Sequence, residues 1–166
     1  MSRIYVAAGS NLGNRLEHLE KAFEFLVQQG TLQAIRQSPI YETDPVGGPK
    51  DQGAFLNAVW VFETSADPQS VLKILQAAEW AQGRVRAEKN GPRVIDLDLA
   101  AYEEILYNQG ALSLPHERMH ERWFVLQPLC DVEPQWRHPF FHKTASELLS
   151  GLPSVSRGIL FKAGAV

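Results

Sequence analysis

The chain has 166 residues, of which 45% are hydrophobic and 21% are charged. This composition excludes a disordered chain, a collagen-like fibre and a coiled coil, and the length suits one globular domain. The net charge is −3, so we expect neither a nucleic acid nor a membrane as a partner, because no general positive charge would attract either of them.

The first part of the chain predicts a strand, a helix and a second strand. Alternating apolar residues favour a strand over 4–8, and Asn14 is a good N-cap for the helix that follows. Gly30 is expected to end that helix. A weaker strand is predicted over 31–43, where Pro39 indicates an edge, a bulge or a break.

The clearest strand is predicted over 54–64, after a loop at 44–53 that contains prolines and glycines. Asp67 is followed by a proline and begins a helix that Gly83 ends. A loop at 84–93 then leads directly into the next strand. Both loops are candidate lids that would exclude water from a reaction.

The second half adds a strand over 94–102, a helix from Pro115 to about Leu126, a short helix near 144–149 and a strand over 158–162. The order β-α-β-β-α-β is typical of the ferredoxin-like arrangement. We therefore expect an α+β fold: an antiparallel sheet with helices on one face and a helical addition at the C-terminus. The other face of the sheet would be free to hold a ligand.

The single cysteine, Cys130, excludes an intrachain disulfide and a zinc site built on several cysteines. It lies in an apolar run and is interpreted as a small buried hydrophobic residue. The N-terminus shows no signal-peptide pattern, and no apolar stretch approaches the length of a membrane span. We expect a cytoplasmic protein, with residues 1–166 forming one domain that acts as a monomer.

Two carboxylates alternate with apolar residues in the predicted strand at 94–102. Side chains on a strand alternate between faces, so Asp96 and Asp98 share one face, about 7 Å apart at Cα. Such a pair can bind one or two hard cations. The alternative is an ordinary solvated sheet face. Because aspartate is disfavoured in strands and like charges on one face repel, we favour the cation site.

The loop before this strand carries four basic residues and one acidic residue, in a chain that is acidic overall. Arg84, Arg86 and Arg93 stand on either side of its turn, and a guanidinium group binds phosphate oxygens through its planar fork. Carboxylates beside several arginines indicate Mg²⁺ held together with substrate phosphates. The alternative is a cluster of ion pairs between these arginines and the two aspartates.

Three further signals are weaker. The segment Gly9–Asn14 lies between a strand and a helix but matches no phosphate-loop pattern, so we interpret it as a structural turn. His116, Glu117 and His120 match the H-E-x-x-H pattern of zinc hydrolases. Because no third ligand is evident, we favour His116 as a phosphate contact and His120 as a surface residue. Phe55 and Asn57 share the non-core face of their strand, where they could bind a flat heterocycle or simply pack.

Taken together, the chain resembles the 6-hydroxymethyl-7,8-dihydropterin pyrophosphokinases of folate biosynthesis. The resemblance extends from Tyr5 to about Leu129. It rests on a series of blocks in order: Gly9–Gly13, Tyr41–Thr43 with Pro45, Phe55–Ala58, Gly83–Arg86, Gly91–Leu99, Pro115–His116, Arg122, Phe124–Leu126 and Pro128–Leu129. The chain departs from many members where Glu117 follows His116, and from some members at Asn90 and Ala111.

The resemblance implies transfer of pyrophosphate from ATP to the pterin hydroxymethyl group, with AMP released. It implies a catalytic centre of Arg84, Arg93, Asp96 and Asp98, in which Asp96 and Asp98 bind two Mg²⁺ ions. The expected phosphate and ATP contacts are Leu72, Gln76, Glu79, Arg84, Arg86, Arg93, Leu99, Ser113, His116 and Arg122. The expected pterin contacts are Thr43, Pro45, Val46, Phe55, Asn57 and Phe124, with the two phenylalanines on either side of the ring. The competing hypotheses are a small zinc hydrolase and a binding module that catalyses nothing.

Overall fold

The structure is a computed structural model that describes residues 1–45, 52–83, 93–153 and 157–163. Its elements are, in chain order, β1 (Ser2–Ser10), α1 (Arg15–Gln28), β2 (Gln33–Gln37), β3 (Ile40–Thr43), β4 (Phe55–Thr64), α2 (Pro68–Ala81), β5 (Asp96–Tyr102), β6 (Tyr107–Gln109), β7 (Leu112–Leu114), a short 3₁₀ turn (Met119–Glu121), α3 (Trp123–Val132), α4 (Ala145–Ser150) and β8 (Ile159–Lys162).

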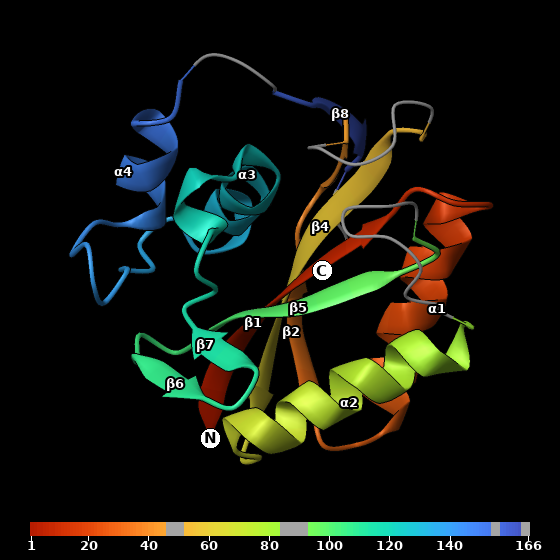
Figure 1. The fold of residues 1–166 in the computed structure, drawn as a ribbon, viewed down its shortest axis with the longest axis horizontal. Coiled ribbons are helices and arrows are strands. Elements are labelled where there is room, and N and C mark those ends of the chain that lie inside the picture. Colours follow the sequence, from red (N-terminus) through yellow and green to blue (C-terminus); the bar gives the residue numbers. More distant parts are fainter. Residues whose placement is uncertain (46–51, 84–92, 154–156, 164–166) are drawn as a thin grey trace.

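One antiparallel sheet organises the fold (Figure 1). Its strand order is β5-β1-β4-β3-β8, and β2 also pairs with β4. The strands β6 and β7 form a separate hairpin. Because β1 lies between β4 and β5, the register places Gly9 beside Asn57 on one side and beside Asp96 on the other.

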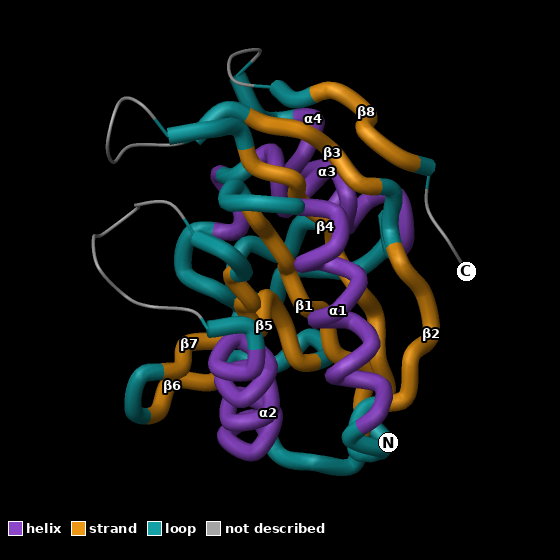
Figure 2. The backbone as a smooth tube through the Cα atoms, turned by 90° about the vertical axis from the view of Figure 1, so that its right-hand side faces the viewer, coloured by secondary structure: helices purple, strands orange, loops and turns teal. Residues whose placement is uncertain are grey.

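Helices α1 and α2 cover one face of the sheet, as Figure 2 shows from the side. The apolar residues that β1, β4 and β5 direct to this face form the larger core with them, among them Val6, Phe62 and Leu99. The predicted core face of β4 is therefore confirmed. Burial of these side chains is the main favourable contribution to folding, at about 25 cal/mol per Å² of apolar area.

The second face is not entirely free, which corrects our expectation. Helix α3 packs over one end of it, α4 packs against α3, and residues of both helices form a second core with Tyr5, Val59 and Val61. Only the other end of this face remains open. The C-terminal region thus covers part of the ligand face, and its last strand, β8, extends the sheet beyond β3.

The predicted starts of the first two helices are confirmed. The side chain of Asn14 accepts a hydrogen bond from the Glu17 N–H, and that of Asp67 accepts one from the Ser70 N–H. The predicted strand over 31–43 is divided at Ser38 and Pro39 into β2 and β3, because the Pro39 nitrogen has no hydrogen to donate to a strand ladder.

The predicted helix beginning at Pro115 is wrong, and the hairpin of β6 and β7 was not predicted. Its strands have three residues each, too few to show alternation. Beyond Pro115 the chain still follows β5, since the His116 N–H donates to the Ala100 carbonyl. Helix α3 begins only at Trp123, and no side chain caps it, so the usual start signal is missing.

Across the described residues, none of the helices combines the length and apolar character that a bilayer crossing needs.

A buried histidine in the C-terminal region leads to a prediction about stability. His138 is 5% exposed, and its Nδ1 accepts hydrogen bonds from the Phe140 and Phe141 N–H groups, at 3.2 and 3.3 Å. Burial, with a smaller contribution from the nearby His120, lowers the pKa of His138 from 6.5 to about 4. The unfolded chain therefore binds this proton at a higher pH than the folded chain does.

We expect the stability that His138 contributes to be complete above pH 6.5 and to be lost as the pH falls from 6.5 towards 4. Asparagine can accept the same local hydrogen bonds without titrating. The urea midpoint of His138→Asn should therefore fall less steeply over this pH range than that of the unmodified chain. Parallel pH profiles for the two proteins would contradict this assignment.

Candidate active site

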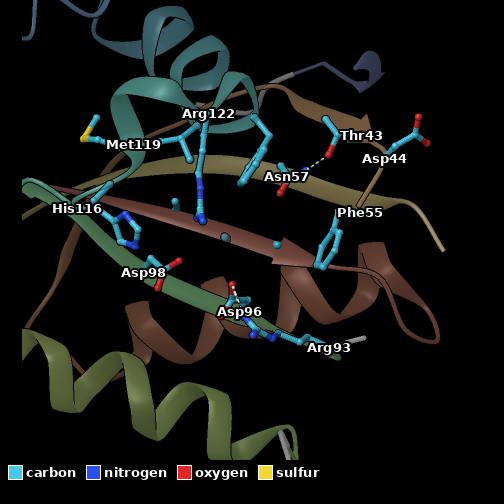
Figure 3. A pocket seen from close by; sticks show the side chains of 16 residues that line it. Thr43, Asp44, Phe55, Asn57, Arg93, Asp96, Asp98, His116, Met119 and Arg122 are labelled. Atoms are coloured by element: carbon cyan, nitrogen blue, oxygen red, sulfur yellow. Dashed lines mark hydrogen bonds and ion pairs between the residues drawn. The ribbon is translucent and has the colours of Figure 1, made fainter. Parts of the chain in front are cut away.

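The open end of the second face forms a pocket that we call the central pocket (Figure 3). Strands β1, β4 and β5 form its floor, and the segment from His116 to Val125 forms its wall. The lining residues are Ala7, Ala8, Gly9, Thr43, Asp44, Phe55, Asn57, Arg93, Asp96, Asp98, Ala100, His116, Met119, Arg122, Phe124 and Val125.

A second hollow, which we call the side pocket, lies between α2, β5 and β7. It is lined by Leu72, Gln76, Glu79, Leu97, Leu99, Ala111, Leu112, Ser113 and Glu117, together with four residues that also line the central pocket: Arg93, Asp96, Asp98 and His116. The two hollows therefore meet at the aspartate pair. A ligand in each would have its reacting end at the same place.

The predicted faces of β5 are confirmed. Leu97 and Leu99 are buried in the larger core, whereas Asp96 and Asp98 point to the opposite side and line both pockets. The small residues Ala7 and Gly9 of β1 lie beside these aspartates in the sheet. Because their side chains are absent or short, the floor between the carboxylates and Asn57 stays open.

Two cationic residues face the carboxylates. Arg93 Nη1 lies 3.2 Å from Asp96 Oδ2. Arg122 extends from the wall towards the floor, as Figure 3 shows, and its Nε is buried without a hydrogen-bond partner. Burial and the charge of Arg118 lower the pKa of Arg122, while Asp98 and Asp96 act against that shift. A half-buried guanidinium whose Nε has no hydrogen-bond partner among the described residues is well suited to receive an anion.

His116 is placed to donate a hydrogen bond. Its Nδ1 accepts from the Arg118 N–H at 3.2 Å, so the neutral ring carries its proton on Nε2. Burial and the positive charge of Arg122 lower the pKa of His116 below 6.5. At neutral pH the ring is therefore an uncharged donor between the two pockets.

A flat slot forms the other end of the central pocket. Asn57 Nδ2 donates to Thr43 Oγ1 at 2.6 Å, and both residues are 6% exposed. Phe55 and Phe124 line the pocket beside this pair, and the Arg122 guanidinium lies 5.5 Å from the centre of the Phe124 ring. Two aromatic rings and a fixed amide are groups that can hold a planar, polar ring.

Glu79 has a structural contact in addition to its place in the side pocket. It is 5% exposed, and its Oε2 accepts a hydrogen bond of 2.9 Å from the Leu97 N–H. Leu97 lies between the two aspartates on β5. The carboxylate of Glu79 therefore fixes the strand that carries them, a contact that sequence spacing did not indicate.

The structure separates the two histidines of the H-E-x-x-H pattern. A zinc hydrolase needs both on one helix face, but this segment is irregular and ends in a 3₁₀ turn. His116 lines the pockets, whereas His120 is half-buried and its ring centre lies 4.6 Å from that of Phe141. The described part of the chain contains no group of three or more His, Cys, Asp or Glu side chains that could hold a metal.

Most of the predicted site residues come together. Leu72, Gln76, Glu79, Leu99 and Ser113 line the side pocket; Thr43, Phe55, Asn57, Arg122 and Phe124 line the central pocket; and Arg93, Asp96, Asp98 and His116 line both. Pro45 lies beside the lining residue Asp44 but lines neither pocket. Val46, Arg84 and Arg86, with most of the two candidate lids, lie outside the described residues.

Asp44 and Met119 line the central pocket without having been predicted. Asp44 directly follows Thr43 and could have been included for its carboxylate. Met119 carried no sequence signal, because a methionine at that spacing is typical of any core.

The sequence matches a known protein family and several of its members. The family described as 7,8-dihydro-6-hydroxymethylpterin-pyrophosphokinase matches residues 5–134. The chain is 39% identical over 153 residues to a Pseudomonas aeruginosa protein named 2-amino-4-hydroxy-6-hydroxymethyldihydropteridine pyrophosphokinase, covering 92% of this chain and 93% of that one. A Bacillus subtilis protein of the same name is 41% identical over 128 residues, covering 77% and 76% of the two chains.

Other relatives are longer. The chain is 39% identical over 150 residues to the Schizosaccharomyces pombe folic acid synthesis protein fol1. The matched region covers 90% of this chain but only 20% of that protein. The Plasmodium falciparum HPPK-DHPS structure with pteroate superposes on this chain with a TM-score of 0.72. The match covers 90% of this chain and 42% of that one, and because the sequence identity is 15%, it supports the fold alone. The family match and the relatives of similar length confirm the resemblance seen in the sequence: this chain belongs to the 7,8-dihydro-6-hydroxymethylpterin-pyrophosphokinase family.

Proposed function

We propose that this chain transfers the pyrophosphoryl group of ATP to the hydroxymethyl oxygen of 6-hydroxymethyl-7,8-dihydropterin, releasing AMP, as a transferase of folate biosynthesis. The observation that carries the proposal is that two pockets of different character meet at Asp96 and Asp98. The aromatic and amide groups of the central pocket suit the pterin, and the side pocket suits the adenosine half of ATP. The proposal also follows the activity in the names of the relatives.

The aspartate pair fits Mg²⁺. In phosphoryl-transfer sites this ion is usually held by one or two carboxylates together with substrate phosphates and water, so a third protein ligand is not needed. Asp96 and Asp98 lie on one strand face where both pockets meet. We propose that they hold two Mg²⁺ ions, which when bound would neutralise phosphate charge and polarise the reacting oxygens.

The side chains of the two pockets would then position the substrates and stabilise the charge on the phosphates. In the reaction the hydroxymethyl oxygen loses its proton and bonds to the β-phosphorus of ATP, while the bond from that phosphorus to the oxygen of the α-phosphate breaks. Phe55 and Phe124 would hold the pterin ring so that this oxygen faces the aspartates. Arg93, Arg122 and the Nε2–H of His116 would donate to phosphate oxygens as negative charge moves towards AMP.

The fold is consistent with this assignment. The order β5-β1-β4, with β2 and β3 on the far side of β4, supports the ferredoxin-like βαββαβ class. We propose that residues 1–166 form one domain of this class that acts as a monomer in the cytoplasm.

The direct test incubates the purified chain with ATP, Mg²⁺ and the pterin and follows AMP and pterin diphosphate by chromatography. Equal amounts of both products, formed only when the pterin is present, are expected. ATP binding without AMP would indicate a binding module. Stoichiometric zinc, with hydrolytic activity lost in Glu117→Gln, would indicate the zinc hydrolase.

Gly9 leads to a prediction about pterin binding. A Cβ at this position would lie 3.1 Å from Asn57 Oδ1 and 3.5 Å from a ring carbon of Phe55. The Asn57 amide is held by Thr43 and cannot move away easily. We therefore expect Gly9→Ala to raise the KM for the pterin about tenfold through overpacking, with little change in the KM for ATP.

Steady-state kinetics with each substrate varied in turn measures this difference. Gly151→Ala is the matched control, since Gly151 has a φ of −82° and its added Cβ would meet only ordinary contacts, at 3.6 Å. An equal rise in both KM values for Gly9→Ala would contradict the assignment of Asn57 to the pterin.

A further inference from the structure

Asn11 connects the two sides of the candidate site without lining either pocket. It follows β1 directly and is 6% exposed. Its hydrogen bonds reach two segments that are distant in the sequence: one around Gly53, shortly before β4, and one at Arg93, shortly before β5. Each of these segments leads directly to residues of the central pocket.

The backbone N–H and the side-chain oxygen of Asn11 hold Arg93 in place. The Asn11 N–H donates to the Arg93 carbonyl at 3.0 Å, and the Arg93 N–H donates to Asn11 Oδ1 at 2.7 Å. This pair of bonds fixes the Arg93 backbone. The Arg93 guanidinium in turn lies 3.2 Å from Asp96. The side-chain oxygen of Asn11 therefore positions the cationic, phosphate-facing side of the site.

The side-chain nitrogen of Asn11 holds the segment that comes directly before β4. Asn11 Nδ2 donates to Gln52 Oε1 at 3.0 Å and to the Gly53 carbonyl at 3.1 Å. Gly53 comes two residues before Phe55 and four before Asn57. The side-chain nitrogen therefore positions the segment that leads to the aromatic and amide groups of the slot.

These contacts use the NH₂ group and the carbonyl oxygen of one short amide. An ionised aspartate has no donor, and a hydroxyl side chain has only one. We propose that Asn11 is a positioning residue that sets the spacing between Arg93 and Phe55, and so between the phosphate-facing and ring-facing parts of the site. The inference rests on the proposed function, because it assigns ATP phosphates to Arg93 and the pterin to Phe55.

Substitutions of Asn11 can test the hydrogen bonds of its side-chain oxygen and of its side-chain nitrogen separately. Asn11→Asp keeps an oxygen for the Arg93 N–H but loses the donor to Gln52 and Gly53. We expect it to raise the Kd of the pterin about fivefold or more, which corresponds to one or two lost hydrogen bonds, and to change the Kd of a non-hydrolysable ATP analogue less than about twofold. The new negative charge lies beside the Arg93 backbone, so any electrostatic effect would fall on nucleotide binding and could not by itself raise the Kd of the pterin alone. Asn11→Ala should raise both Kd values.

Isothermal titration of the full chain with Mg²⁺, each ligand being titrated alone, measures these constants. Asn14→Ala is the matched control, because Asn14 lies in the same turn and its side chain caps α1 through the Glu17 N–H. This variant should lower the melting temperature and leave both Kd values unchanged. If Asn11→Asp fails to fold, Gln52→Ala replaces it, with a rise of about twofold or more expected in the pterin Kd alone.

Each outcome decides one question. If the unmodified chain binds neither ligand, the proposed function fails and the inference fails with it. If the unmodified chain binds both ligands and Asn11→Asp or Gln52→Ala shows unchanged Kd values, or equal changes in both, the proposed function stands and the positioning role of Asn11 is wrong.

Discussion

Asp98→Asn is expected to lower kcat for pyrophosphoryl transfer on the order of 10²- to 10³-fold while the protein stays folded. Asp98 lines both pockets where they meet, and asparagine keeps its size but removes the charge that would hold Mg²⁺ against the phosphates. The protein should stay folded, because asparagine has nearly the size of aspartate and its side-chain oxygen can still accept hydrogen bonds. Asp96→Asn should lower kcat similarly, although it also loses the ion pair with Arg93.

The rate of AMP formation at saturating substrates, measured across a Mg²⁺ titration, tests this prediction. The variant's melting temperature should also respond less to Mg²⁺ with an ATP analogue. Glu63→Gln is a suitable control, since Glu63 lies on β4 outside both pockets and pairs with Arg3 at 3.1 Å. An Asp98→Asn protein with the kcat of the unmodified chain would remove the aspartate pair from the mechanism.

The aspartate pair could be predicted because the side-chain period of a strand is two and does not depend on the rest of the fold. The same rule placed Phe55 and Asn57 on the ligand face of β4, and the structure brings them to the pocket that the aspartates line. The N-caps Asn14 and Asp67 were equally local signals, each confirmed by a hydrogen bond to an N–H three residues later.

Residues of the pocket wall were harder to place. His116 and Arg122 come from an irregular segment that was predicted to be a helix. Among the described residues, no side chain caps the start of the 3₁₀ turn or of α3, so the usual sign of a helix start is missing. The apolar residues of α3 indicate that it packs against something, but they do not specify which face of the sheet it covers. That choice depends on contacts between segments distant in the sequence, such as those that bring Leu126 and Leu129 of α3 into one core cluster with Val59 of β4.

The role of Asn11 could not be predicted from the sequence for the same reason. Its segment was interpreted as a structural turn, but its role depends on Gln52, Gly53 and Arg93, which are far away in the sequence. Only the folded chain brings these partners together. Local periodicity therefore located the groups that face the ligands, and the tertiary structure was needed to find the groups that hold them in place.

Arg122 should be a residue whose loss removes activity without destabilising the fold. Its Nε is buried and unsatisfied, so the ligand-free protein carries the cost of an unmade hydrogen bond. We expect Arg122→Met to lower kcat/KM about 10²-fold or more, because a donor aimed at developing phosphate charge is lost. The melting temperature of the ligand-free variant should be equal to or higher than that of the unmodified chain, since methionine fills the space without an unpaired polar group.

Arg122→Lys separates charge from geometry. Lysine keeps the positive charge but lacks the planar fork, so we expect it to recover part of the lost kcat/KM and not all of it. Arg118→Ala is the control, because Arg118 lies on the same segment but pairs with Glu121 at 2.9 Å on the surface. That variant should keep kcat/KM within about twofold, as exposed ion pairs contribute little. A large fall in the melting temperature of Arg122→Met would instead show that this arginine supports the wall of the pocket rather than a bound phosphate.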